Sequence, residues 1–182
     1  WALLVVFTLN ISWVCFAFIN ALAGLGSALA TASRPEEKIN VTRIAGARTV
    51  IAFPIYNEDV DQIFATVLST AQSLSGAPGN FECFILSDTT DPSIALREEA
   101  AYERIQALRP ADVKVRYRRR TINLHRKSGN IRDFVTRWGG RYDYMIVYDA
   151  DSYMERDAIL RIVDAMQASP KTGLIQTIPQ LV

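Results

Sequence analysis

The stretch Tyr144-Met145-Ile146-Val147-Tyr148-Asp149-Ala150-Asp151 carries an apolar run directly into two aspartates separated by one small residue. Such a run is typical of a buried parallel strand. Residues i and i+2 of an extended chain point to the same side, so Asp149 and Asp151 should face one point just beyond the strand's carboxyl end. Two carboxylates that close repel unless a cation lies between them, and oxygen ligands suit Mg²⁺ or Mn²⁺. The alternative for Asp-Ala-Asp alone is a turn followed by a helix N-cap.

Composition sets limits on the function. The chain has 182 residues, which is long enough to build one hydrophobic core. Its net charge of +1 gives no general attraction to nucleic acid. Two cysteines indicate neither a disulfide framework nor a metal site, and the single histidine, His125, argues against a histidine triad or a zinc centre. Because the sequence lacks an initiator Met and begins and ends in apolar runs, we expect a fragment truncated at the C-terminus.

The N-terminal stretch is free of charge up to Arg34. Roughly twenty residues cross the ~30 Å core of a bilayer, so we predict a transmembrane helix over residues 1–30 and a juxtamembrane connector over 31–47. Ala28-Leu29-Ala30 resembles a signal-peptide cleavage site, but the apolar part is longer than a signal core. Polar and small residues on one helical face predict packing against further membrane helices; they are Asn10, Trp13, Ala17 and Asn20.

Residues 48–182 alternate between strand and helix patterns. Strands are expected at 48–55, 81–86, 113–118 and 144–148, and apolar residues recur at helical spacing in 60–74, 101–108, 131–138 and 159–166. Asp91 and Pro92 mark the start of the second helix, and Gly139-Gly140 the end of the third. A fifth apolar segment spans 173–178. This order predicts an α/β fold with a mostly parallel sheet and helices on both faces.

Polar residues follow each expected strand. They are Tyr56-Asn57-Glu58, Asp88, Arg118-Arg119-Arg120, and the pair Asp149 and Asp151. Because ligands of parallel α/β sheets bind beyond the carboxyl ends of the strands, these groups together predict a site at that edge.

The charges around this edge favour a diphosphate ligand. From Lys114 to Arg141 there are ten Lys or Arg residues and one acid, Asp133. Basic groups beside a metal-binding acidic pair suit bound phosphates, and Ser128-Gly129-Asn130 is predicted to open a helix whose N–H groups add positive charge. A solvated face or attraction to anionic lipids is the alternative. Nucleic acid fits poorly, since no aromatic residues interleave with the basic ones.

Five motifs occur in the order and spacing of the processive membrane glycosyltransferases of family 2, which the chain resembles. They are Pro54-Ile55-Tyr56-Asn57-Glu58, Ser87-Asp88, Lys127-Ser128-Gly129-Asn130, Asp149-Ala150-Asp151 and Gln176-Thr177-Ile178-Pro179. Further stretches, 86–92 and 138–144, resemble the members of this family that build the backbone of osmoregulated periplasmic glucans in the bacterial inner membrane.

This resemblance implies a GT-A fold for residues 48–182, with UDP-glucose as donor and an inverting transfer to a growing β-glucan. It implies that the uridine is held by Tyr56, Asn57, Glu58 and Asp88. It implies a nucleotide pocket lined by Lys127, Gly129 and Asn130. Asp149 and Asp151 would bind the divalent ion and the diphosphate, and Gln176 and Thr177 would lie toward the glucose and the acceptor.

The resemblance also implies parts that lie elsewhere. The general base is expected beyond Val182, so the fragment alone should not catalyse transfer. UDP-sugars are cytosolic, so a multi-pass inner-membrane protein with a cytoplasmic catalytic domain is expected. Alternatives are another family 2 synthase, such as a cellulose, chitin or hyaluronan synthase relative, a non-catalytic membrane-tethered nucleotide-binding module, or a secreted soluble domain after signal cleavage.

Overall fold

The computed structural model describes residues 1–32, 38–149 and 152–177. By internal contacts the chain divides into two units, Trp1–Lys38 and Ile39–Val182.

The first unit contains helix α1 (Ala2–Ala32). Within the described ranges it is the one helix long and apolar enough to cross a membrane, with 26 residues from Ala2 to Ser27 at a mean hydropathy of 2.3. The side chains of Thr8, Ser12 and Asn20 donate to the carbonyl oxygen four residues earlier, at 2.7 to 2.8 Å. These three donor groups are thereby satisfied inside their own helix. A signal sequence meets the same criteria of length and composition.

The second unit alternates between strands and helices, as the sequence predicts. Its strands are β1 (Arg48–Ile55), β2 (Asn80–Ser87), β3 (Lys114–Arg119) and β4 (Tyr144–Val147). Its helices are α2 (Val41–Ile44), α3 (Val60–Ser73), α4 (Pro92–Leu108), α5 (Arg126–Trp138) and α6 (Arg156–Ala168), and a short 3₁₀ turn, η1 (Gly139–Arg141), follows α5.

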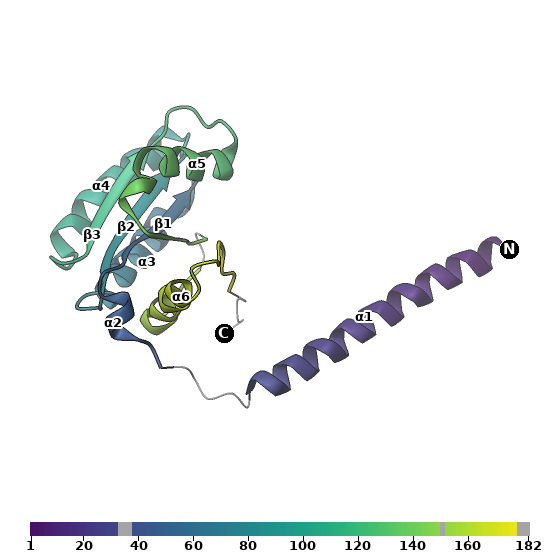
Figure 1. Ribbon diagram of the computed structural model, residues 1–182. Helices are drawn as coiled ribbons and strands as arrows, with labels where there is room; N and C mark the ends of the chain where they lie inside the picture. The colour runs from purple at the N-terminus through teal and green to yellow at the C-terminus, as the bar shows by residue number, and fades with distance from the viewer. Residues whose placement is uncertain (33–37, 150–151, 178–182) are drawn as a thin grey trace. The chain divides into compact units, whose positions relative to one another are not determined.

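The four strands form one parallel sheet in the order β3-β2-β1-β4 (Figure 1). All of their carboxyl ends therefore meet at one edge. Ile55 of β1 pairs with Ser87 of β2, which pairs in turn with Arg119 of β3. This register places the three loops that follow those strands side by side.

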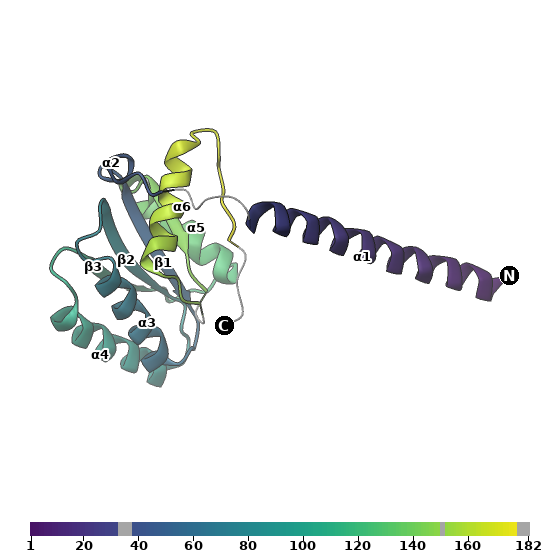
Figure 2. The same cartoon turned by 90° about the horizontal axis from the view of Figure 1, so that it is seen from below.

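Helices cover both faces of the sheet (Figure 2). On one face, Ile51 and Phe53 of β1 join a large core with apolar residues of α3, α4 and α6. On the other face, Val50 and Ala52 pack with Phe134 of α5 in a smaller core. Successive residues of β1 thus enter opposite cores, which explains why its sequence is apolar without alternation.

The prediction that the strand before Asp149 is buried was wrong. Strand β4 lies at the edge of the sheet, and its burial alternates. Met145 and Val147 are 37% and 40% exposed, whereas Ile146 joins the large core. Met145 and Val147 pair with Val50 and Ala52, so they share the face that α5 covers only in part.

The helix starts follow local capping chemistry. The carboxylate of Asp91 accepts hydrogen bonds from the N–H groups of Ser93 (2.8 Å) and Ile94 (3.2 Å), which confirms the predicted start of α4. Asp59 caps α3 in the same way. Helix α2 lies inside the predicted connector, where Asn40 caps it and Asp164 of α6 accepts a bond from the Asn40 N–H. Residues 173–177 have no regular secondary structure.

Candidate functional site

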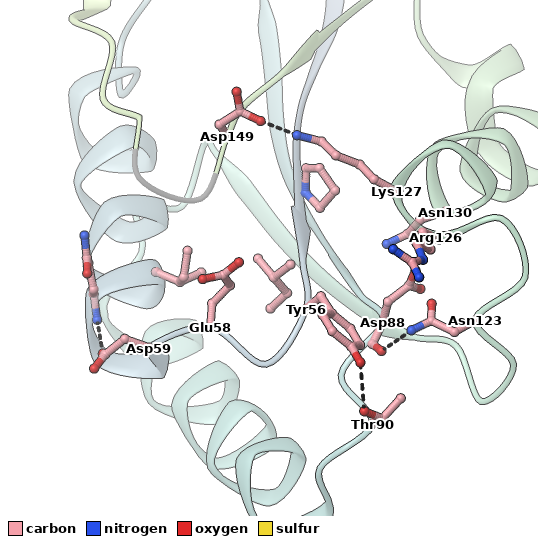
Figure 3. Close-up of a pocket in the computed structure, with 14 residues that line it drawn as sticks. Tyr56, Glu58, Asp59, Asp88, Thr90, Asn123, Arg126, Lys127, Asn130 and Asp149 are labelled. Atoms are coloured by element: carbon pink, nitrogen blue, oxygen red, sulfur yellow. Dashed lines mark hydrogen bonds and ion pairs between the residues drawn. The ribbon is translucent and has the colours of Figure 1, made fainter.

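A cavity of about 940 Å³ opens at the carboxyl edge of the sheet (Figure 3). This is the size of a site for a small organic ligand. Its wall is formed by the ends of β1 and β2, the start of α3, the loop before α5, the start of α5 and the residue that follows Tyr148. The lining residues are Pro54, Ile55, Tyr56, Glu58, Asp59, Gln62, Ile63, Asp88, Thr90, Asn123, Arg126, Lys127, Asn130 and Asp149.

Several of the predicted site residues meet in this cavity. Those that line it are Tyr56, Glu58, Asp88, Lys127, Asn130 and Asp149. Asn57 and Gly129 stand next to lining residues but do not line it themselves. Gln176 and Thr177 are exposed and are not part of its wall. Asp151 lies outside the described residues.

Lys127 and Asp149 form an ion pair across the cavity (Figure 3). Lys127 extends from the first turn of α5, and Asp149 follows the end of β4. Their side chains are 52% and 65% exposed, so both charges face solvent within the cavity. A solvated pair of this kind contributes little to stability, which leaves both groups available to a ligand.

The sequence predicts that the arginines after β3 surround a diphosphate. In the structure none of the three lines the cavity, and each binds another group of the protein. Arg118 pairs with Asp133 at 3.3 Å, and Arg119 donates to the carbonyl oxygen of Thr89 at 3.2 Å. Arg120 binds the carboxylate of Asp88, and this hydrogen bonding raises the pKa of Arg120. From the basic run, the cavity receives Arg126 and Lys127.

Asn57 joins two loops of the cavity instead of facing into it. Its backbone is left-handed, with φ 52°. Its side-chain oxygen accepts from the N–H groups of Thr90 (3.1 Å) and Asp91 (3.2 Å), and its own N–H donates to the Thr89 hydroxyl (3.1 Å). The turn after β1 is therefore fastened to the loop after β2.

The start of α5 differs from the prediction that Ser128-Gly129-Asn130 opens the helix. Helix α5 begins at Arg126, after His125 in a left-handed conformation with φ 61°. The Gly129 N–H already donates to the His125 carbonyl oxygen at 3.0 Å, so it is not free to bind an anion. The N–H groups that have no partner four residues back within this helix belong to the residues before Gly129, and of these the Arg126 N–H donates to the Asn123 carbonyl oxygen at 3.4 Å.

Gly129 and Asn130 shape the wall at this point. A Cβ on Gly129 would lie 2.0 Å from the carbonyl oxygen of Leu124, so only glycine lets the preceding loop approach so closely. Asn130 is buried, and its side-chain N–H donates to the Leu86 carbonyl oxygen at 2.8 Å. Its side-chain oxygen has no hydrogen-bond partner among the described residues.

Two carboxylates of the cavity are candidate ligands for a divalent cation. They belong to Asp149 and Glu58, and oxygen donors are the ligands of Mg²⁺ and Mn²⁺. In this structure the ammonium group of Lys127 occupies one oxygen of the Asp149 carboxylate, so a cation bound there would replace it. Among the described residues, which do not include Asp151, no group of three or more potential ligands occurs.

Sequence reasoning missed Asn123 and Arg126 as lining residues. Asn123 fixes the loop before α5, since its side-chain N–H donates to the Asp88 carbonyl oxygen at 3.0 Å. It stands between two aliphatic residues of an irregular loop, where no periodicity marks it. Arg126 belongs to the basic stretch between Lys114 and Arg141. It was not expected in the wall because α5 begins at Arg126, earlier than predicted.

Comparison with known proteins extends this picture. Residues 50–180 match the model of "Glycosyl transferase family 2". Proteins named "Glucans biosynthesis glucosyltransferase H" from Shewanella sp. (strain W3-18-1) and Shewanella putrefaciens (strain CN-32) are each 44% identical over 98% of this chain and 24% of the relative. The protein of that name from Shewanella oneidensis is 43% identical over 99% of this chain and 25% of the relative.

The chain thus spans about a quarter of the length of these curated relatives. Among solved structures, the protein Rv1636 from Mycobacterium tuberculosis H37Rv is 14% identical, with a TM-score of 0.34 over 74% of this chain and 98% of that one, which is too low to bear on the fold. The family match covers residues 50–180, which is most of the chain and includes all four strands except the first two residues of β1. The chain belongs to glycosyl transferase family 2.

Proposed function

We propose that this chain forms the donor-binding part of a glucosyltransferase that uses UDP-glucose to extend the β-glucan backbone of osmoregulated periplasmic glucans. Family membership and the names of the relatives support sugar transfer in glucan biosynthesis. The observation that carries the proposal is the meeting of Lys127 with Asp149 in a cavity beyond the carboxyl ends of parallel strands, which also contains Asp88 and Tyr56.

The uridine is assigned to the side of the cavity formed by the loops after β1 and β2. Tyr56 offers a half-exposed ring there, and an aromatic face stacks well on a base. Asp88 lies deeper in the wall, held by Arg120, and Glu58 lines the cavity beside Tyr56. Asn57 supports this side by fixing the loops.

The diphosphate is assigned to the opposite side, near the start of α5. Lys127 and Arg126 supply positive charge there, and charge-assisted hydrogen bonds to phosphate are among the stronger polar contacts. Gly129 and Asn130 bring the start of α5 into place. A divalent ion, Mg²⁺ or Mn²⁺, held by Asp149 and Asp151 would neutralise further charge on the diphosphate.

The proposed reaction is an inverting displacement at the anomeric carbon of glucose. The acceptor hydroxyl attacks from the face opposite UDP, the new glycosidic bond forms as the bond to the β-phosphate oxygen breaks, and UDP leaves. Lys127 and Arg126 stabilise the charge that develops on this phosphate, so they act more on the transition state than on the ground state. The acceptor proton passes to a general base that we assign to the protein beyond Val182.

The proposed setting is the bacterial inner membrane. Helix α1 is long enough to span it, and further transmembrane helices would make the intact protein multi-pass. The catalytic domain faces the cytoplasm in this proposal, because the UDP-sugar donor is made there. Gln176 and Thr177 are assigned to the glucose and acceptor side.

Transfer of labelled glucose from UDP-glucose, measured with the full-length protein in inner-membrane vesicles, tests the proposal. The wild type should form labelled glucan, Asp149→Asn should lose this activity, and Asp157→Asn, a change of an exposed aspartate in the first turn of α6, should keep it. A panel of other UDP-sugars separates this function from that of another family 2 synthase. Wild-type glucan levels in cells carrying Asp149→Asn would instead support a non-catalytic module.

A further inference from the structure

Residues along two loops of the cavity alternate in direction. In the turn after β1, Tyr56 and Glu58 line the cavity, and Asn57 between them does not. In the loop after β2, Asp88 and Thr90 line it. Ser87, which precedes Asp88, and Thr89, which lies between Asp88 and Thr90, are almost completely buried and point away from the cavity.

Ser87 and Thr89, which point away from the cavity, both contact one buried carboxylate, that of Glu98 in α4. Glu98 is 1% exposed. It accepts hydrogen bonds from the hydroxyl groups of Ser87 (2.7 Å), Thr89 (2.5 Å) and Tyr117 (2.9 Å). A buried charge is tolerated when its oxygens are satisfied in this way. No cation is paired with Glu98 in the described part of the chain.

The network continues from Glu98 to the cavity wall. The Thr89 hydroxyl gives its hydrogen to Glu98 and accepts from the Asn57 N–H at 3.1 Å. The Ser87 hydroxyl gives its hydrogen to Glu98 and accepts from the Thr89 N–H at 3.2 Å. Because Glu98 only accepts, it fixes the direction of both hydroxyl groups, and each then presents a lone pair to the backbone of the loop.

We propose that Glu98 is a positioning residue that holds the loops after β1 and β2 in the shape that binds the nucleotide. It acts on Asp88 through Ser87 and Thr89, which flank it, and on Tyr56 and Glu58 through Asn57. This proposal rests on the nucleotide site proposed above. Tyr117 bonds to the same carboxylate from β3 and also interacts with the Ser87 hydroxyl. It has no hydrogen bond to Thr89 or Asn57 among the described residues, so it supplies an internal comparison for the link through Thr89.

The test compares variants of the full-length protein for UDP affinity by calorimetry with Mn²⁺, for KM and kcat with UDP-glucose, and for melting temperature. Thr89→Val removes the hydroxyl that links Glu98 to Asn57, and Glu98→Gln places an N–H₂ group against at least one of the hydroxyl hydrogens. Both should weaken UDP binding by about tenfold and raise KM with little change in kcat. Thr89→Ser keeps the hydroxyl and should restore wild-type affinity.

Tyr117→Phe removes a part-buried bond to the same carboxylate, so it should lower the melting temperature while leaving UDP affinity within about twofold. Glu99→Gln, at an exposed neighbouring position, should change neither quantity. If the wild type binds UDP and Thr89→Val binds it equally well, or Tyr117→Phe weakens binding as much, the positioning role of Glu98 is refuted. If the folded wild type does not bind UDP, the nucleotide site itself is refuted and this proposal with it.

Discussion

Arg120 and Asp88 form a bidentate ion pair at the wall of the cavity, with Nε 2.7 Å from Oδ1 and Nη2 2.6 Å from Oδ2. Their side chains are 12% and 4% exposed, so the pair is largely withdrawn from water. Arg120 reaches Asp88 from the loop after β3, one strand away from the loop that carries the aspartate. The pair therefore fixes the position of an acid that the proposed nucleotide would meet.

Replacing Arg120 with Gln leaves the buried carboxylate of Asp88 without its counter-charge. Loss of one partner of a buried pair costs about 3–5 kcal/mol, so Arg120→Gln should lower the free energy of unfolding by that order. Denaturant unfolding measures this. The double variant Asp88→Asn with Arg120→Gln should recover part of the loss, because no charge is then stranded. Equal losses in the single and double variants would show that the pair is not the cause.

Replacing Lys127 with Ala separates binding from stability. The Lys127–Asp149 pair is more than half exposed, so Lys127→Ala should change the unfolding free energy by less than about 1 kcal/mol. Loss of a charged contact to the diphosphate should weaken UDP binding by about tenfold or more. Lys114→Ala is the matched control, because Lys114 lies at the amino end of β3, away from the carboxyl edge that forms the cavity. It should leave the UDP affinity measured by calorimetry unchanged. An equal effect of both variants would exclude a specific role for Lys127.

Replacing Gly129 with Ala tests the close approach at the start of α5. The added Cβ would meet the Leu124 carbonyl oxygen at 2.0 Å, and backbone cannot yield as a side chain does. Gly129→Ala should therefore destabilise the fold by about 1–3 kcal/mol, as overpacking does. Gly140→Ala is the control, since a Cβ there meets nothing within 4 Å. Thermal unfolding compares the two, and similar melting temperatures would contradict the assigned role of Gly129.

Replacing Asp143 with Asn tests how acid affects the contact between β1 and the segment before β4. Hydrogen bonds from Arg48 lower the pKa of Asp143 to about 2, from an ordinary value of 3.8. Because the folded pKa is depressed, the contribution to stability is complete above about pH 4 and is lost as pH falls through about 2. The difference in unfolding free energy between wild type and Asp143→Asn should shrink over this range. A difference that stays constant from pH 5 to 2 would contradict it.

The fold follows from sequence patterns to a large extent, because strands and helices of this type carry strong periodic signals. The range predicted for the first strand, 48–55, is the range of β1, and Asp91 caps α4 as expected. The edge position of β4 carries no such signal, because an apolar tetrapeptide looks the same at the edge of a sheet as inside it. Helix α2 is only four residues long, and its Asn40 cap is linked to Asp164, far along the chain.

The candidate site could be predicted in outline, since parallel strands bring their carboxyl ends together whatever the side chains do. Pairing within the site could not be predicted in the same way. Arg118 and Arg120 look like free phosphate-binding groups in the sequence, yet both are paired with aspartates, because a charge that becomes buried needs a partner. Glu98 did leave a signal. It stands on the buried stripe of α4 with Ala95, Ala101 and Ile105, where an acid is out of place unless hydrogen bonds satisfy it.

The most direct test of the central claim is calorimetric titration of UDP into the folded full-length protein with Mn²⁺ present. The account predicts saturable binding at one site, much weaker binding of uridine, and loss of UDP binding both when the metal is chelated and in Asp149→Asn. No UDP binding by the wild type, or undiminished binding by Asp149→Asn, would contradict the claim that this cavity holds a sugar-nucleotide diphosphate between Lys127 and a cation at Asp149.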